Sequence, residues 1–234
     1  LMSSLKARKK ITHKEIKKDK LVTGYFEARN WLDSEENKKK VYIGIAAIVV
    51  IVAGIFLYIS NRNAKNEEAE VKLSAVISLY EQGKYAEAMN GDPAAGIMGL
   101  NAIVNEYGST NSGETAKLYL GNCYFNLKDY DNALKQFDSY SGSNDIIKSS
   151  CISGMGAIYE AKGDLKKAGE YYEKAANVNK GVVINQENLF YAIRAYTNAG
   201  DKESAKRIFA SLKEQYPKSK YINEAKRFES EFKN

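Results

Sequence analysis

Residues 41–60, VYIGIAAIVVIVAGIFLYIS, form a run of 20 residues without a charged side chain. As a helix, this run rises about 30 Å, which matches the hydrocarbon core of a bilayer. Its six isoleucines, four valines, Phe56 and Leu57 together favour insertion into lipid by about 4–7 kcal/mol. A buried core helix rarely needs this length, and a cleaved signal peptide has a shorter apolar region behind a short basic start. The run therefore predicts a retained, single transmembrane helix.

Basic residues lie mainly on the N-terminal side of this run. Residues 1–40 hold 12 of the 35 Lys and Arg residues and six of the 29 acidic residues, whereas the other flank offers only Arg62 and Lys65. The positive-inside bias therefore predicts a basic cytoplasmic tail at 1–40 and an exported domain at 61–234. The exported part keeps 23 basic and 23 acidic residues, so the pI near 9.0 is no argument for nucleic-acid binding.

The tail carries local patterns of its own. Thr12 and Glu15 form a capping box, the usual signature of a helix start. Further on, apolar residues recur at roughly helical spacing among charges: Leu21, Val22, Tyr25, Phe26 and Leu32. Two interpretations stay open for this segment. It is either a basic retention signal beside the membrane or a short amphipathic helix that docks on the bilayer surface or on a membrane partner.

Three segments of the exported part can be superimposed on one another. They are LGNCYFNLKDYDNALKQF from Leu120, MGAIYEAKGDLKKAGEYYEKA from Met155 and AIRAYTNAGDKESAKRIFASLKEQYP from Ala192. Each places an aromatic residue, a turn residue, an alanine and a second aromatic residue at fixed offsets: Tyr124, Lys128, Ala133, Phe137; Tyr159, Gly163, Ala168, Tyr172; and Tyr196, Gly200, Ala205, Phe209. Small residues let two antiparallel helices approach closely, and the aromatic side chains fill the space between them.

This pattern resembles the tetratricopeptide repeat, with Gly121 and Gly156 at its small first-helix position and Pro217 at its terminal proline. The resemblance implies an all-α superhelix behind the transmembrane helix. It has about four repeats, near 69–112, 114–147, 149–182 and 186–219, and a capping helix at 220–233. The first repeat is irregular, because NGDPAAG interrupts it with an insertion of roughly eight residues. Asp92 as a cap and Pro93 in a first turn predict a helix start inside this insertion.

The residues offer little for catalysis. The sole histidine, His13, lies in the tail, on the other side of the membrane from the repeats. Cys123 and Cys151 lack a C-x-x-C spacing, and either buried thiols or a structural disulfide would account for them. The glycine-bearing stretches GIMG, SGMG and SGSND are turns or helix contacts rather than phosphate loops. We therefore predict that the protein is not an enzyme and uses no cofactor, metal, nucleic acid or small-molecule substrate.

Binding of proteins is the remaining activity. In tetratricopeptide domains the first helices line a concave groove, and the repeat register places these residues on it: Leu73, Ile77, Tyr80, Leu118, Tyr119, Asn122, Phe125, Asn126, Glu160, Phe190, Tyr191, Arg194 and Asn198. The aromatic members either bind an apolar, extended or helical segment of a partner, or fill the interior of the superhelix and meet the capping helix. The Hsp90-type clamp is excluded, because it needs a lysine where Leu118 stands and an asparagine where Gly154 stands.

The basic tail, the single span and a repeat body ending in EQYPKSKYINEA resemble the YfgM-like family, the ancillary subunits of the bacterial protein-export translocon. The resemblance covers residues 38–234. It implies a scaffold in the bacterial inner (cytoplasmic) membrane, with a periplasmic C-terminal domain that binds translocon subunits, a periplasmic chaperone or exported clients. A structural adaptor in envelope assembly or cell-division coordination is the main alternative. A redox or cytochrome-maturation helper would need reactive cysteines.

Overall fold

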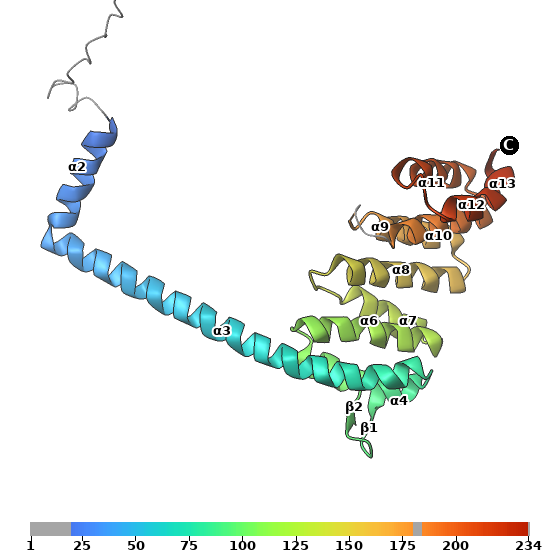
Figure 1. Ribbon diagram of the computed structural model, residues 1–234, viewed down its shortest axis with the longest axis horizontal. Coiled ribbons are helices and arrows are strands. Elements are labelled where there is room, and N and C mark those ends of the chain that lie inside the picture. Colours follow the sequence, from blue (N-terminus) through green and yellow to red (C-terminus); the bar gives the residue numbers. More distant parts are fainter. Residues whose placement is uncertain (1–19, 180–183, 234) are drawn as a thin grey trace, which may run out of the picture. The chain divides into compact units, whose positions relative to one another are not determined.

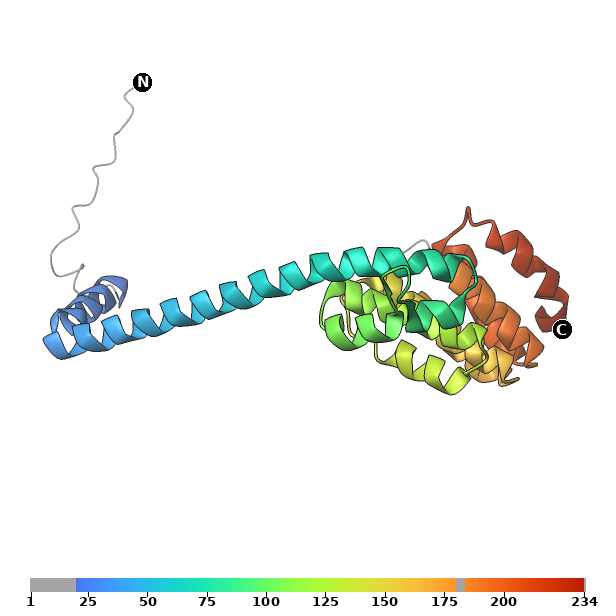
Figure 2. The ribbon, with the colours of Figure 1, turned by 90° about the horizontal axis from the view of Figure 1, so that it is seen from below.

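The computed structural model describes residues 20–179 and 184–233, so the capping box at Thr12 and Glu15 and the histidine His13 lie outside the described residues. The chain divides into two compact units, Leu1–Ser60 and Asn61–Asn234. Helices make up almost all of the described residues of both units. Figure 1 shows the helices of the second unit stacked in chain order, and Figure 2 shows the same helices from below. The fold is all-α, as the sequence predicts.

The first unit contains α2 (Lys20–Asp33) and the first part of α3 (Glu35–Glu81). Residues 42–60 of α3 are all exposed, and an 18-residue window of this helix has a mean hydropathy of 2.7 with none of it buried in the protein. A core helix of a water-soluble domain would bury this surface. The helix is therefore a candidate membrane span, by length and composition.

Three helical pairs follow one another in the second unit: α6 (Asn111–Asn126) with α7 (Tyr130–Asp138), α8 (Asp145–Ala161) with α9 (Leu165–Ala176), and α10 (Asn185–Asn198) with α11 (Lys202–Gln215). Each pair packs against the next. The predicted small residues occur where the helices meet: a Cβ on Gly121 would lie 2.5 Å from the Phe137 ring, and one on Gly156 would lie 2.9 Å from the Tyr172 ring. Ala168 of α9 is fully buried in the core.

Each pair turns at a residue in the left-handed region, and an aspartate follows it. The turn residues are Lys128 with φ 63°, Gly163 with φ 82° and Gly200 with φ 74°. The aspartates cap the second helices: Asp129, Asp164 and Asp201 accept hydrogen bonds from the backbone N–H three residues on. A turn residue followed by aspartate therefore starts every second helix of these pairs.

The first repeat departs from this plan after α4 (Tyr85–Asn90). The prediction of a helix start at Asp92 and Pro93 is wrong: β1 (Gly91–Asp92) pairs with β2 (Ile97–Met98) in an antiparallel hairpin, and α5 (Leu100–Tyr107) begins later. Asp92 Oδ1 does accept from the N–H groups of Ala94 and Ala95, at 3.0 and 3.2 Å. Hydrogen bonding of this kind caps helices elsewhere, but at Asp92 it closes a tight turn.

The predicted capping helix is broken into α12 (Tyr221–Ala225), a 3₁₀ segment η1 (Lys226–Phe228) and α13 (Glu229–Lys233). Phe232 is buried, and its ring lies 5.7 Å from the ring of Phe209 in α11. These segments cover the apolar end of the last helical pair, which is the role that a terminal cap has in stacked repeats.

Candidate partner-binding groove

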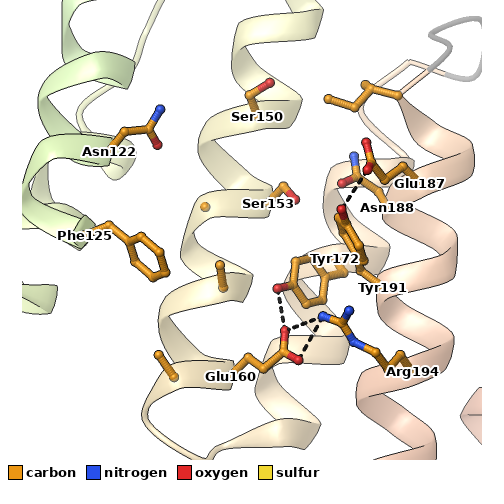
Figure 3. A pocket seen from close by; sticks show the side chains of 14 residues that line it. Asn122, Phe125, Ser150, Ser153, Glu160, Tyr172, Glu187, Asn188, Tyr191 and Arg194 are labelled. Atoms are coloured by element: carbon orange, nitrogen blue, oxygen red, sulfur yellow. Dashed lines mark hydrogen bonds and ion pairs between the residues drawn. The ribbon is translucent and has the colours of Figure 1, made fainter. Parts of the chain in front are cut away.

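A cavity of about 630 Å³ opens on the side of the second unit that is lined by α6, α8 and α10 (Figure 3). These are the first helices of the three successive pairs. We call this cavity the groove. Its lining comprises Asn122, Phe125, Ser150, Ser153, Gly154, Ala157, Glu160, Ala161, Tyr172, Ile184, Glu187, Asn188, Tyr191 and Arg194.

Small side chains of α8 form the middle of the groove. Ser150, Ser153, Gly154, Ala157 and Ala161 recur three or four residues apart, so they share one face of the helix. Gly154 has a structural reason of its own, because a Cβ there would lie 2.7 Å from the Phe137 ring of α7. The small side chains on this face of α8 therefore leave space for the groove.

Glu160 of α8 is the centre of a polar cluster at one end of the groove (Figure 3). Arg194 Nη2 of α10 donates to both of its carboxylate oxygens, at 2.9 and 3.0 Å, and the Tyr172 hydroxyl of α9 donates to it at 2.7 Å. Burial, together with the bond to Glu160, raises the pKa of Tyr172 far above its usual range. The Nε atom of Arg194 is buried and has no hydrogen-bond partner among the described residues.

Tyr191 and Glu187 form the rim that α10 contributes. The Tyr191 hydroxyl donates to Glu187 Oε1 at 2.7 Å, and the Arg194 guanidinium lies 5.0 Å from the Tyr191 ring centroid. Burial and the bond to Glu187 raise the pKa of Tyr191 to about 12. The ring is therefore held in place at both its polar tip and its face.

A matching cluster lies outside the groove. Arg207 of α11 donates to both oxygens of Glu173 at 2.6 and 2.8 Å, and the Tyr196 hydroxyl donates to Glu173 at 3.2 Å. The Arg194–Glu160 and Arg207–Glu173 pairs each span 34 residues. Because none of Tyr196, Glu173 and Arg207 lines the groove, this second cluster offers a natural comparison for the first.

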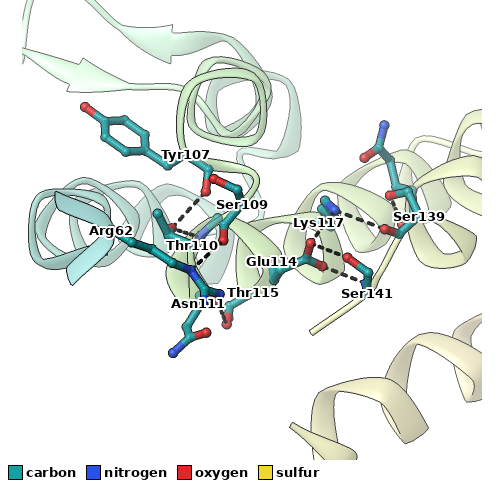
Figure 4. A network of polar contacts seen from close by, with 12 residues as sticks. Arg62, Tyr107, Ser109, Thr110, Asn111, Glu114, Thr115, Lys117, Ser139 and Ser141 are labelled. Atoms are coloured by element: carbon teal, nitrogen blue, oxygen red, sulfur yellow. Dashed lines mark hydrogen bonds and ion pairs between the residues drawn. The ribbon is translucent and has the colours of Figure 1, made fainter. Parts of the chain in front are cut away.

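A further polar network fixes the start of α6, the helix that carries Asn122 and Phe125 (Figure 4). Glu114 is buried and pairs with Lys117 Nζ at 2.7 Å, and it accepts from the N–H and the hydroxyl of Ser141, both at 2.8 Å. Lys117 also donates to the Ser139 carbonyl at 3.0 Å. These bonds attach α6 to the chain that leaves α7.

Five of the residues that the sequence places on a groove line this one: Asn122, Phe125, Glu160, Tyr191 and Arg194. The others lie elsewhere. Leu73 is a core residue, only 6% exposed, and Ile77, Tyr80 and Tyr119 pack beside the same core, with the Tyr80 and Tyr119 rings 5.2 Å apart.

Phe190 meets the capping segments instead of the groove, because its ring stacks on Tyr221 of α12 at 5.5 Å and lies 6.4 Å from Phe228. Asn126 and Asn198 are exposed at the last residues of α6 and α10. The alternative left open by the sequence, that some aromatic residues meet the cap, therefore describes Phe190.

Tyr172, Glu187 and Asn188 also line the groove, although the sequence did not predict them there. Tyr172 belongs to a second helix, yet its hydroxyl reaches Glu160 in the groove. Asn188 is 1% exposed and donates to Ser149 Oγ at 3.0 Å, which in turn donates to the Ala175 carbonyl. One signal in the sequence pointed to this polar cluster. Glu160 and Arg194 are 34 residues apart, which equals one repeat, so they occupy equivalent positions on neighbouring first helices.

Comparison with known families agrees with this geometry. One model of the tetratricopeptide repeat matches residues 115–141 and 187–219, and a second matches residues 153–181. These helical pairs are tetratricopeptide repeats. Tetratricopeptide repeats generally serve as non-enzymatic scaffolds for protein–protein interaction. Their first helices supply the lining of the groove, with the exceptions of Tyr172 and of Ile184, which directly precedes α10.

The two cysteines of the repeats are buried and free. Cys123 packs in the core shared with α3, and Cys151 in the core around Phe137. Burial raises the pKa of each thiol to about 12. Thiols that stay protonated are poor nucleophiles, so both residues behave as small core side chains.

Proposed function

We propose that the groove binds a short helical or extended segment of a protein partner. The observation that carries this proposal is a cavity of about 630 Å³ whose lining comes from the first helices of three successive repeats. Helices that pack about 8–10 Å apart give such a surface a width of about 16–20 Å. That width accommodates five or six extended residues, or three turns of a helix.

The chemistry of the lining defines the kind of segment. Phe125 and Tyr191 offer aromatic surface at opposite sides, and the small residues of α8 let a backbone approach closely. Glu160 is already neutralised by Arg194, whereas Glu187 accepts from the Tyr191 hydroxyl and makes no ion pair among the described residues. An apolar segment with one lysine or arginine would therefore fit best.

We further propose that the protein is a membrane-anchored scaffold at the periplasmic face of the bacterial inner membrane, where it assists the translocon and chaperones with exported chains. The support is the combination of a candidate span, the charge bias beside it and the repeats that follow, together with the resemblance to YfgM-like proteins. Exported chains present apolar segments with scattered basic residues before they fold, which is the chemistry that the groove fits.

Site-specific photo-crosslinking in intact membranes tests both statements. A photoreactive phenylalanine analogue at Phe125 should crosslink a partner, whereas the same analogue at the exposed Lys206 of α11 should not. Tyr191→Ala and Arg194→Ala should lower the yield from Phe125 by about tenfold, since aromatic and arginine residues are frequent hot spots. Arg207→Ala removes the equivalent pair outside the groove and should leave the yield unchanged.

The identity of the crosslinked protein decides the finer proposal. Translocon subunits, chaperones or nascent exported chains would support it, whereas envelope-assembly or cell-division proteins would favour the structural adaptor. Equal yields from Phe125 and Lys206, or equal losses with Arg194→Ala and Arg207→Ala at unchanged melting temperatures, would contradict the groove itself.

A further inference from the structure

Helix α2 exposes apolar side chains that no described residue of the first unit covers. Tyr25 is 61% exposed, Phe26 52% and Leu32 44%. With Val22, these residues follow helical spacing and share one side of α2, whereas Glu27 lies on the opposite side, beside Trp31, which is also 52% exposed. Large apolar side chains gathered on one side of an exposed helix indicate a surface that is covered in the functional state.

The position of α2 in the chain limits what can cover it. The helix ends at Asp33, the chain bends at Ser34, and α3 begins at Glu35. Val41 is the sixth residue after Glu35 in the same helix, a rise of about 9 Å. If residues 41–60 span the bilayer, the C-terminal end of α2 therefore lies within the thickness of the headgroup layer, where amphipathic helices bury their apolar side.

The charges around α2 suit an anionic surface. Arg29 lies between the apolar residues, and a long side chain can extend its guanidinium to the level of the lipid phosphates. Lys38, Lys39 and Lys40 stand just before the span, although Lys38 and Lys40 also pair with Glu35 and Glu36 at 2.9 and 2.7 Å. Such exposed pairs within one helix are weak and do not prevent contact with lipid.

We propose that α2 lies along the bilayer surface, with Val22, Tyr25, Phe26 and Leu32 inserted at the boundary between headgroups and acyl chains, and that anionic lipids contact Arg29 and the lysines before the span. The proposal rests on residues 41–60 crossing the membrane and is independent of the groove. It assigns the amphipathic segment of the tail to the membrane rather than to a protein partner.

Tryptophan fluorescence of the full-length protein in vesicles tests the proposal, because the chain has one tryptophan, Trp31. In a Trp31→Phe background, a new tryptophan is placed at Tyr25 on the apolar side, at Glu27 on the opposite side, or at Val50 within the span. The vesicles contain phosphatidylcholine with phosphatidylglycerol and carry brominated acyl chains as quencher. Melting curves check that each variant folds like the parent.

We expect the Tyr25→Trp protein to be quenched at least about twofold more than the Glu27→Trp protein, and the difference to grow with the phosphatidylglycerol content. Strong quenching of Val50→Trp with equally weak quenching of the other two would overturn the proposal and leave a protein partner or a free helix. Equal, strong quenching of both α2 variants would also contradict it, since no side would then face lipid. Absence of quenching at Val50 would show that residues 41–60 do not enter the bilayer. It would contradict both the span and this proposal, but not the proposed groove.

Discussion

At the scale of single residues, Lys128 holds a backbone conformation that the other repeats assign to glycine. Its φ is 63°, beside 82° at Gly163 and 74° at Gly200. A non-glycine residue in the left-handed region destabilises the folded state by about 1–2 kcal/mol. Glycine avoids this cost but loses about 0.5–1 kcal/mol more in conformational entropy when the chain folds. Lys128→Gly should therefore stabilise the repeats by about 0.5–1 kcal/mol, measured by chemical denaturation of the full chain in detergent.

Gly163→Lys is the reciprocal control for this turn. A Cβ at Gly163 would meet no atom within 4 Å, so any loss of stability comes from the backbone alone. We expect a destabilisation of about 1 kcal/mol. If Lys128→Gly weakened the protein while Gly163→Lys did not, the left-handed turn would not be the shared device of these repeats.

What the sequence predicts well at this scale is the side of a helix on which a residue lies. The repeat register correctly placed Ala168 in the core, and Gly121 and Gly156 against aromatic rings. It could not predict that the Tyr172 hydroxyl reaches Glu160 from the core, because a helical pattern gives direction but not the reach of a polar tip. Long side chains are buried at one end and polar at the other.

At the scale of helices, the ion pair of Glu114 and Lys117 joins α6 to the chain after α7. Their side chains are 9% and 12% exposed, so a substitution leaves a charge with little access to water. Glu114→Gln should therefore cost about 2–3 kcal/mol in the free energy of unfolding. The matched change Glu173→Gln affects a pair whose arginine is 57% exposed, and it should cost at most about 1 kcal/mol.

The same pair makes stability depend on pH. Burial alone would raise the pKa of Glu114, but the Lys117 ammonium and the bonds from Ser141 outweigh burial and hold the pKa below its ordinary value of 4.5. A carboxyl with a lowered folded-state pKa adds stability above pH 4.5, and that contribution disappears as the pH falls through the folded-state value.

The difference in unfolding free energy between the wild type and Glu114→Gln should therefore be largest near neutral pH and should shrink at acid pH. Denaturation series at several pH values measure it. A difference that stayed constant down to acid pH would show that Glu114 acts through its shape rather than its charge.

Helices were predicted more reliably where the repeat pattern is regular. Asp92 and Pro93 misled, because an aspartate that accepts from two following N–H groups suits a turn as well as a cap. The antiparallel pairing of Gly91 with Met98 makes this segment a hairpin. Phe190 misled for a different reason: the register put it on a first helix, but the capping segments cover that part of the last repeat.

At the scale of the whole molecule, the groove could be located from the sequence only in its middle and C-terminal repeats. There the first helices α6, α8 and α10 keep one register, and five predicted residues line one cavity. In the first repeat, α3 and the hairpin replace the regular pair, and Leu73, Ile77 and Tyr80 join a core. The position of a residue in one repeat predicts its surroundings in another repeat only if both repeats have equivalent neighbours.

The distribution of basic residues yields the last prediction, which concerns membrane topology. Lys38, Lys39 and Lys40 directly precede the candidate span, and residues 1–40 hold 12 basic residues. Because translocating such a flank is unfavourable, protease added to the outside of intact spheroplasts should digest the chain only beyond about residue 60 and leave a fragment of the tail and span. Replacing all three lysines with asparagine should give a mixture of orientations, seen as a fraction of chains whose repeats resist the protease, whereas replacing Lys213, Lys218 and Lys220 in the repeats should change nothing. Protection of the repeats in the wild-type protein would show the reversed orientation and exclude a periplasmic partner for the groove.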